Sequence, residues 1–397
     1  MSTFGTLFRV TTYGESHCAS VGAIIDGCPP GLELSAADIQ VQMSRRRPGQ
    51  SNLTTPRNEK DMIQLQSGLE HGVTLGTPIG LLVRNEDQRP HDYTETDLYP
   101  RPSHADWTYL EKYGVKASSG GGRSSARARP LARRVAAGTI AEKYLKTAYG
   151  IEIVAFVTSV GKISVPSAPL PTARGDAVDD GDDTAEDALT PDFRNLLNSV
   201  TREEVDKFPT RCPHAETSER MTKVPSSRRA RLRQVRGEAC DAMLSIPATK
   251  AFEVGSVSAA RKCQARSTTT CLFAKRMAAG TATNWSGGIQ GASRMGEAIY
   301  FRVGFKSPAT ISQVQETAKL RWYACTLATR GRHDPCVVPR AVPIVEAMAA
   351  LVVMDLLPPV TTLPPTMVMP PPQVTVKLIA EEKNGGGSAL TGAVVDV

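Results

Sequence analysis

Apolar residues along the chain gather in short runs that predict β-strands. Residues 7–11 and 21–25 are rich in β-branched residues with glycine nearby, and they predict two strands. Glycine and β-branched residues mix over residues 73–83, which predicts a hairpin. Further apolar runs at residues 151–157 and 298–305 predict two more strands. The predicted strands are therefore spread over most of the chain.

Three other stretches predict helices. Ser35 with Asp38 three residues later has the pattern of a capping box, so we expect a helix over residues 36–46. Residues 135–145 have a good helix composition. Residues 343–357 are apolar nearly all round, which predicts a helix that is buried or that packs against another subunit.

Two stretches lack any such pattern. Residues 165–190 are rich in proline, alanine and aspartate, and their carboxylates crowd together without an apolar period. We expect an acidic, disordered insertion there and not a metal site. Residues 358–397 are rich in proline and glycine and predict a disordered tail. Residues 1–357 are expected to form one large domain.

The charge balance favours an anionic ligand. The 397 residues are 41% hydrophobic, which is enough to bury one large core or two ordinary ones. The formal net charge is +7 and the arginines are clustered. Such a chain attracts a polyanion, or a small phosphorylated substrate or cofactor. Nucleic acid is the weaker of these interpretations, because only 5% of residues are aromatic and no nucleic-acid-binding motif is present.

The remaining composition points to a cytoplasmic protein. Residues 1–9 lack the apolar core of a signal peptide, and no apolar run reaches the length of about 18 residues that a membrane span needs. The eight cysteines are scattered, with no CxxC pair. We therefore expect no zinc site, no disulfide framework and a reducing compartment.

Two stretches are candidate anion sites. The predicted helix over residues 36–46 runs into Arg45–Arg47. Cations stabilise a helix C-terminus, so a structural role is open, but three arginines exceed what the helix dipole needs and favour an anion site. Residues 118–127 hold three consecutive glycines followed by an arginine and two serines, so backbone N–H groups could bind phosphate. The same composition is also typical of a flexible linker.

Three histidines lie in polar stretches. His17 follows Ser16 at the end of a predicted strand, His104 has an arginine and an aspartate nearby, and His333 precedes Asp334. A single histidine is more often structural than catalytic. Polar loops that hold a histidine beside a carboxylate or a hydroxyl are nevertheless suited to proton transfer, because histidine titrates near neutral pH.

Taken in order, these stretches resemble the chorismate synthase family. The motifs that carry the resemblance are residues 8–17, 26–31, 45–50, 85–90, 101–106, 120–127, 286–291, 331–335 and 339–346. Several long motifs occur in the order of the family, so the resemblance is specific. The motif sequences are most similar to those of the fungal-type branch. This resemblance implies a bifunctional enzyme that reduces its own flavin with NADPH.

The resemblance implies a fold and a reaction. The fold would be an α+β protein of the β-α-β sandwich type, and the assembly a homotetramer. The enzyme would be a carbon–oxygen lyase acting on phosphates, at the last step of the shikimate pathway in aromatic amino acid biosynthesis. It would remove phosphate from 5-enolpyruvylshikimate-3-phosphate by 1,4-anti-elimination and form chorismate. Reduced FMN would be required without net redox change.

The resemblance also implies roles for particular residues. His17 with Ser16 would protonate the departing phosphate, and His104 would supply a proton or positive charge near the flavin. Asp334 would act as proton acceptor, with Ser125 in the same relay. Arg46 and Arg47 would hold the anionic substrate or NADPH. The FMN contacts would be Arg123, Ser124, Ser125, Gly291, Lys306, Ser307, Pro308, Ala309, Thr310 and Arg332.

Four segments depart from the family pattern, namely residues 128–134, 223–237, 256–282 and 320–329. Each begins and ends abruptly beside an intact motif. This favours the hypothesis of a shifted reading frame or misassigned splice sites, which transcript sequencing would test. The alternative to an active enzyme is therefore an inactive or folding-impaired relative that keeps its anion and flavin motifs. Nucleic-acid binding through the arginines of residues 228–236 is a third hypothesis.

Overall fold

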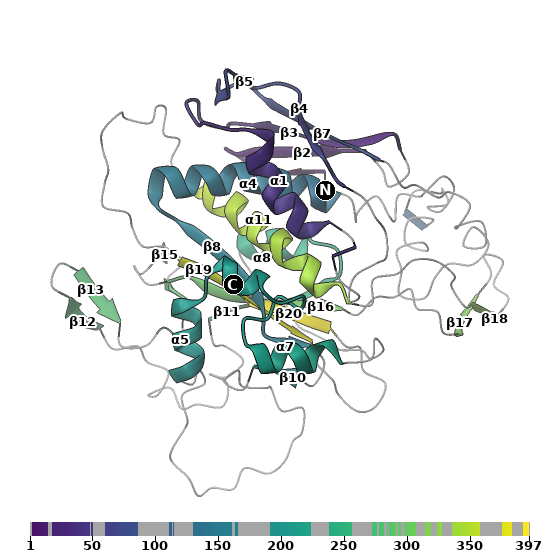
Figure 1. Ribbon diagram of the computed structural model, residues 1–397, viewed down its shortest axis with the longest axis vertical. Coiled ribbons are helices and arrows are strands. Elements are labelled where there is room, and N and C mark those ends of the chain that lie inside the picture. The colour runs from purple at the N-terminus through teal and green to yellow at the C-terminus, as the bar shows by residue number, and fades with distance from the viewer. Residues whose placement is uncertain are drawn as a thin grey trace, which may run out of the picture. The chain divides into compact units, whose positions relative to one another are not determined.

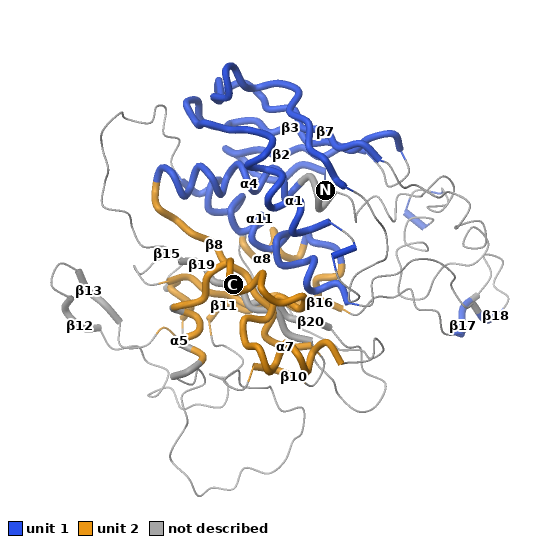
Figure 2. The backbone as a smooth tube through the Cα atoms, in the orientation of Figure 1, with its two compact units in different colours: residues 1–148, 245–247, 308–367 blue, residues 149–244, 248–307, 368–397 orange. Residues whose placement is uncertain are grey.

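The structure is a computed structural model, and contacts between Cα atoms divide the chain into two compact units (Figure 2). Unit 1 comprises residues 1–148, 245–247 and 308–367, and unit 2 comprises residues 149–244, 248–307 and 368–397. Neither unit is a continuous stretch of sequence. The residues described are 2–14, 18–47, 49–50, 60–85, 111–112, 114, 130–160, 163–165, 191–223, 238–255, 272–275, 278–281, 284, 286–290, 293–294, 298–306, 314–318, 324–327, 336–357, 375–382 and 392–396.

Unit 1 contains a five-stranded antiparallel sheet in the order β1-β2-β3-β7-β4. Its strands are β1 (Thr3–Phe4), β2 (Arg9–Tyr13), β3 (Ser20–Asp26), β4 (Ile63–Leu65) and β7 (Ile79–Arg84). Val10, Ile25 and Ile79 stand opposite one another and are buried, whereas Ile24 on the other face is 47% exposed. Only one face of this sheet therefore belongs to the core, as the period of two along a strand requires.

Three helices cover that buried face (Figure 1). They are α1 (Ala36–Arg46), α4 (Pro130–Tyr149) and α11 (Val338–Leu356). Helix α1 is amphipathic and buries Ile39 and Met43, which lie one turn apart. Helix α11 is buried along most of its length, which agrees with its nearly continuous apolar sequence.

Two contacts fix α11 within unit 1. A Cβ atom added at Gly138 of α4 would lie 2.4 Å from the Cβ atom of Ala347, so the two helices approach closely because this residue has no side chain. At the other end of α11, the Asp355 carboxylate accepts hydrogen bonds from the backbone N–H groups of residues 6–8, at 2.8, 2.5 and 2.9 Å. The carboxylate thus connects α11 to the chain segment before β2.

Unit 2 is built on a mixed five-stranded sheet in the order β11-β16-β19-β20-β8, with additional pairings of β16 with β20 and of β19 with β8. Its strands are β8 (Glu152–Val157), β11 (Thr249–Val254), β16 (Tyr300–Lys306), β19 (Thr375–Glu382) and β20 (Gly392–Asp396). Strand β19 runs parallel to β8 and β16, while β11 and β20 run antiparallel to β16. Consecutive residues of β8 and β16 are buried, so both faces of these strands are covered.

Short helices and hairpins complete both units. The helices of unit 2 are α5 (Pro191–Ser199), α6 (Arg202–Asp206), α7 (Ala215–Thr222) and α8 (Glu238–Leu244). Its hairpins pair β9 (Ser159–Val160) with β10 (Ile163–Ser164), β12 (Leu272–Lys275) with β13 (Ala278–Thr281), and β14 (Ile289–Gln290) with β15 (Ser293–Arg294). Unit 1 adds β5 (Leu69–Glu70) with β6 (Val73–Thr74), and β17 (Gln315–Ala318) with β18 (Ala324–Leu327). None of the described helices is long and apolar enough to cross a membrane.

Most predicted elements are confirmed, and one is wrong. Helix 36–46 has the predicted bounds, and Ser35 and Asp38 form the reciprocal capping box. The hairpin predicted over residues 73–83 does not form, because β6 pairs with β5 and β7 pairs with β3 and β4. The turn lies earlier, at His71 and Gly72, whose φ angles are +49° and +80°.

The predicted tail differs from the structure in part. Within residues 358–397, the structure describes the strands β19 and β20. Apolar residues alternate with a lysine along β19 at Val376, Lys377 and Leu378, and pairing with β8 and β16 gives this segment its partners. The domain boundary at residue 357 stays a prediction. Of the predicted acidic insertion, all but residue 165 lies outside the described residues.

The contact at Gly138 gives a stability prediction. Gly138→Ala should lower the free energy of unfolding by about 1–3 kcal/mol, because the new methyl group would meet both the side chain and the backbone of Ala347. Thr147→Ala, at an exposed position of the same helix, is the control and should change it by less than about 0.5 kcal/mol. Urea unfolding of both variants measures these changes in the free energy of unfolding. Equal stability of Gly138→Ala and the parent protein would contradict the close approach.

Candidate functional site

Three of the predicted site residues lie within the described part of the chain. Arg46 ends α1, Arg47 follows it, and Lys306 ends β16. The other predicted site residues lie outside the described residues, so their proposed roles stay predictions. They are Ser16, His17, His104, Arg123, Ser124, Ser125, Gly291, Ser307, Pro308, Ala309, Thr310, Arg332 and Asp334. The candidate site is therefore built from the end of α1 in unit 1 and the end of β16 in unit 2, each taken by itself.

The last turn of α1 is closed by polar side chains. The Gln50 Nε2 group donates to the backbone carbonyls of Ser44, Arg45 and Arg47, at 2.7, 2.7 and 2.8 Å. The Arg340 Nε group, from the first turn of α11, donates to the Arg46 carbonyl at 3.2 Å. Carbonyls at a helix end lack intrahelical partners. These donors satisfy them and so hold the arginine-bearing end of the helix in place.

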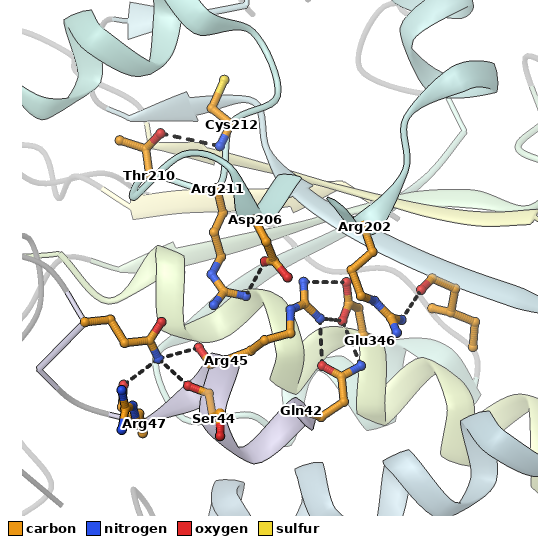
Figure 3. A network of polar contacts seen from close by, with 12 residues as sticks. Gln42, Ser44, Arg45, Arg47, Arg202, Asp206, Thr210, Arg211, Cys212 and Glu346 are labelled. Carbon is orange, nitrogen blue, oxygen red and sulfur yellow. Dashed lines mark hydrogen bonds and ion pairs between the residues drawn. The ribbon is translucent and has the colours of Figure 1, made fainter. Parts of the chain in front are cut away.

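Arg45 belongs to a buried polar network (Figure 3). Its guanidinium donates through Nη1 to a carboxylate oxygen of Glu346 on α11, and through Nη2 to the other oxygen at 3.4 Å. It also donates to the Gln42 Oε1 atom at 2.7 Å. Gln42 Nε2 in turn donates to Glu142 of α4 at 2.8 Å. The network joins α1, α4 and α11, and Arg45 has a structural role within it.

Arg46 makes a different ion pair. Its Nη1 atom lies 3.1 Å from the Asp61 Oδ2 atom, and the two side chains are only 8% and 7% exposed. Asp61 comes from the segment just before β4, and not from a helix. A buried charge is tolerated when it is paired and hydrogen-bonded, and Asp61 provides that compensation.

Arg47 differs from both neighbours. It is exposed, and its backbone closes the helix through a hydrogen bond from its N–H group to the Met43 carbonyl at 3.0 Å. No hydrogen bond or ion pair of its guanidinium is formed within the described residues. Arg45 and Arg46 are thus compensated by buried carboxylates, whereas no carboxylate of the described residues compensates the exposed Arg47.

A second cationic group lies at the end of β16 in unit 2. Burial, and secondarily the positive charge of Lys250, lower the pKa of Lys306 below its ordinary value. Lys250 lies on β11, the strand that pairs with β16, and the Lys306 N–H group donates to the Ala248 carbonyl at 2.8 Å. Two ammonium groups that repel each other would be stabilised by an anion between them.

Other arginines of unit 2 have structural contacts. Arg202 donates to a backbone carbonyl of β8 at 2.8 Å, and the Arg211 Nη1 atom lies 3.2 Å from the Asp206 carboxylate (Figure 3). Arg302 is 3% exposed and its guanidinium carbon lies 5.9 Å from the centre of the Phe193 ring. These contacts account for part of the arginine excess without any ligand.

Two of the described cysteines, Cys28 and Cys212, are buried. Burial raises the pKa of Cys28 and of Cys212 to about 12, so neither thiol is a nucleophile at neutral pH. Across the described residues, no group of three or more histidine, cysteine, aspartate or glutamate side chains could hold a metal ion.

Sequence patterns missed four residues that shape these sites, namely Asp61, Lys250, Arg340 and Glu346. Glu346 had a usable signal, since it is the one carboxylate within the apolar residues 343–354. A lone charge in a buried helix predicts a buried partner. Asp61 and Lys250 lie in segments with no distinctive pattern, so only the fold reveals their contacts.

Comparison with known proteins gives the family. A family model described as chorismate synthase matches residues 8–357. A curated chorismate synthase from Schizosaccharomyces pombe is 58% identical over 381 residues, which cover 89% of this chain and 95% of that protein. The chain belongs to the chorismate synthase family. It is accordingly a lyase whose reaction removes phosphate.

Two further chorismate synthases extend the comparison. The protein from Neurospora crassa is 54% identical over 404 residues, covering 89% of this chain and 90% of its own length. The protein from Saccharomyces cerevisiae is 50% identical over 383 residues, covering 90% and 96%. All three relatives are fungal, in agreement with the fungal-type branch indicated by the motifs.

A solved structure agrees with the fold. A crystal structure of chorismate synthase matches the chain with a TM-score of 0.60 and 23% identity, over 89% of this chain and 92% of that chain. The predicted α+β chorismate synthase fold is confirmed.

The Arg45–Glu346 pair gives a second stability prediction. Arg45→Met or Glu346→Leu alone should cost about 3–5 kcal/mol, because each leaves a buried charge without its partner. The double variant should cost clearly less than the sum, because both charges are removed together. Chemical unfolding of the parent protein, the two single variants and the double variant measures this double-mutant cycle. Asp26→Asn, which breaks an ion pair whose side chains are 54% and 42% exposed, is the control and should have a much smaller effect. Additive losses would contradict the pairing.

The lysine pair gives a pH prediction. Lys250→Met should raise the pKa of Lys306 toward its ordinary value, since it removes one of the two causes that lower it. Between the lowered value and the unfolded pKa of about 10.4, the unfolded chain binds more protons, so stability rises with pH in this window. Lys250→Met should make stability rise less steeply with pH in this window. NMR titration of the lysine side chains measures the shift, with Lys223→Met, at an exposed ion pair, as control. An unchanged Lys306 titration would contradict the coupling.

Proposed function

We propose that the protein catalyses the 1,4-anti-elimination of phosphate from 5-enolpyruvylshikimate-3-phosphate, giving chorismate. One C–O bond to phosphate and one C–H bond break, a new C=C bond forms, and no net oxidation or reduction occurs. The observation that carries this proposal is the match of the family model over residues 8–357. The cationic groups of the described residues support it, since substrate and product are both anionic.

The substrate would be held by the end of α1. It carries two carboxylates and a phosphate, so it needs several cationic partners. Arg47 is exposed with a charge that no described carboxylate compensates, and the adjacent Arg46 is fixed by Asp61. Preorganised donors of this kind stabilise the charge that develops on the leaving phosphate.

The family implies a reduced flavin, which we propose is FMN. Lys306, at the end of β16, would contribute positive charge toward the phosphate of this cofactor. The other residues that would hold it are Arg123, Ser124, Ser125, Gly291, the segment 307–310 and Arg332. When bound, reduced FMN supplies the electronic chemistry of the elimination, while the protein provides binding and orientation.

Proton transfer would fall to histidines and a carboxylate. His17, next to Ser16, would donate a proton to the departing phosphate, and His104 would place a proton or positive charge near the flavin. Asp334 would accept a proton, in a relay with Ser125. These assignments rest on the motifs and on the suitability of each side chain for the step.

The remaining features of the proposal come from the fungal-type branch. NADPH would reduce the flavin, which makes the enzyme bifunctional, and Arg46 and Arg47 are the candidate residues for its phosphate. We further propose a cytoplasmic homotetramer with no nucleic-acid or membrane partner.

Departures from the family pattern do not exclude folded elements. Pro130, in the first altered segment, is the first residue of α4, a position where proline is favourable. Residues 272–275 and 278–281 of the third segment form the β12–β13 hairpin. Residues 324–327 of the fourth form β18. At these positions the departures are accommodated within a helix and strands.

An anaerobic assay tests this function. Purified protein with dithionite-reduced FMN and substrate should release phosphate and form chorismate in equal amounts. His17→Ala and His104→Ala should each lower turnover about 100-fold or more, because each removes a proton-transfer group. His71→Asn, at an exposed turn with a φ of +49°, is the control and should keep full activity.

Other outcomes identify the alternatives. Soluble protein that neither binds FMN nor releases phosphate would indicate an inactive relative. Salt-sensitive RNA binding would indicate a nucleic-acid partner. Wild-type rates in both histidine variants would contradict the assigned roles.

A further inference from the structure

One carboxylate of unit 1, that of Asp355, accepts hydrogen bonds from three successive backbone N–H groups. The N–H groups of Thr6, Leu7 and Phe8 donate to its Oδ1 atom at 2.8, 2.5 and 2.9 Å. The Thr6 nitrogen also lies 2.8 Å from the Oδ2 atom. Successive N–H groups that converge in this way form a nest, a concave site for an anion. The carboxylate therefore occupies an anion site that is made of backbone alone.

Two glycines shape the turn that carries these N–H groups. Gly5 has a φ angle of +86°, and a Cβ atom there would lie 2.1 Å from the carbonyl oxygen of Phe8. A Cβ atom at Gly27 of the neighbouring chain segment would lie 1.9 Å from the carbonyl oxygen of Leu7. Both contacts are made with backbone atoms, so a side chain at either glycine would displace the turn. The nest thus owes its shape to contacts other than those of Asp355.

Asp355 stands where its charge is unfavourable for its own helix. It is the second-to-last residue of α11, and the last turn of this helix holds no basic residue. A negative charge near a helix C-terminus is destabilising, because the helix dipole is negative there. The three N–H donors of the nest provide the compensation that the helix end does not. The contact with the nest accounts for an acidic residue at this position.

We propose that residues 6–8 form a preorganised nest for a small oxyanion and that Asp355 is its built-in ligand, a latch that holds the N-terminal segment to α11. The other attachment of this segment is short, since β1 pairs with β2 over only two residues. Loss of the latch should therefore loosen the segment while the rest of the sheet stays paired. The proposal concerns the fold of unit 1 and does not depend on the reaction that the protein catalyses.

A tethered ligand explains why a free anion does not compete in the parent protein. Folding keeps the Asp355 carboxylate next to the nest, which gives it a high effective concentration. Charge-assisted hydrogen bonds of this kind are about twice as strong as those between neutral groups. Removal of the carboxylate leaves the three N–H donors in place, because the turn keeps its glycine contacts. A free carboxylate of the same size can then bind.

Asp355→Ala, with and without formate, tests the proposal. The substitution removes the carboxylate and keeps the Cβ atom, so formate replaces the group that is lost. Without formate, the amides of residues 6–8 should exchange their hydrogens about tenfold faster or more than in the parent protein, because their charge-assisted hydrogen bonds are lost. Formate should restore slow exchange, whereas chloride at the same ionic strength should not. Hydrogen exchange of the full chain, followed by mass spectrometry of N-terminal peptides, measures both effects.

Two variants serve as controls. Asp355→Asn has nearly the same shape as the parent residue, so its side chain still fills the nest. It should speed exchange of residues 6–8, and formate should not reverse this effect, because the site is not vacated. Glu219→Ala removes an exposed carboxylate that pairs with Lys223 in unit 2. Exchange of residues 6–8 should stay at the parent rate in this variant, which also reports any general effect of formate on the protein.

Each outcome decides a part of the proposal. Parent-like exchange of residues 6–8 in Asp355→Ala would overturn the latch. Faster exchange that formate does not slow would overturn the preorganised nest. Equal rescue by chloride would show a general salt effect and would also overturn it. Should Asp355→Ala not fold in chloride, formate should restore folding, and failure to do so would contradict the proposal. In that case parent-like exchange in Asp355→Asn would likewise overturn the latch.

Discussion

Two guanidinium groups at the end of α1 are removed from water, and their charges must be compensated inside the protein. Glu346 and Asp61 do so, from α11 and from the segment before β4. An unpaired charge in such surroundings costs several kcal/mol, so the three segments cannot separate without a large penalty. The position of α1 in unit 1 depends on these two pairs as well as on its apolar face.

Charge compensation distinguishes the three arginines of this run. Compensation of Arg45 and Arg46 leaves Arg47 as the exposed cation of the three. A helix end with three arginines therefore combines two compensated charges and one exposed charge in one short motif. Its inner members fix the helix, and its outer member faces solvent, where an anion can reach it. In unit 2, burial and, secondarily, the positive charge of Lys250 lower the pKa of Lys306, and a bound anion would relieve the repulsion between the two ammonium groups.

Local signals explain why part of the fold was predictable. The capping box at Ser35 and Asp38 lies within one helical turn, so the start of α1 follows from four residues. The apolar character of α11 likewise requires no knowledge of its neighbours. The hairpin predicted over residues 73–83 was wrong because β7 finds partners in β3 and β4, which no local pattern in that segment reports.

The sequence by itself determined the family, the main helices and strands, and the presence of an arginine cluster suited to anions. Tertiary structure decided which of those arginines is compensated, because the partners of Arg46 and Arg45 lie 15 and 301 residues away along the chain. Burial depends on how distant segments pack, and a charge behaves as a structural pair or as a binding group according to that burial. Residue type alone does not distinguish Arg45 from Arg47; the positions of Glu346 and Asp61 do.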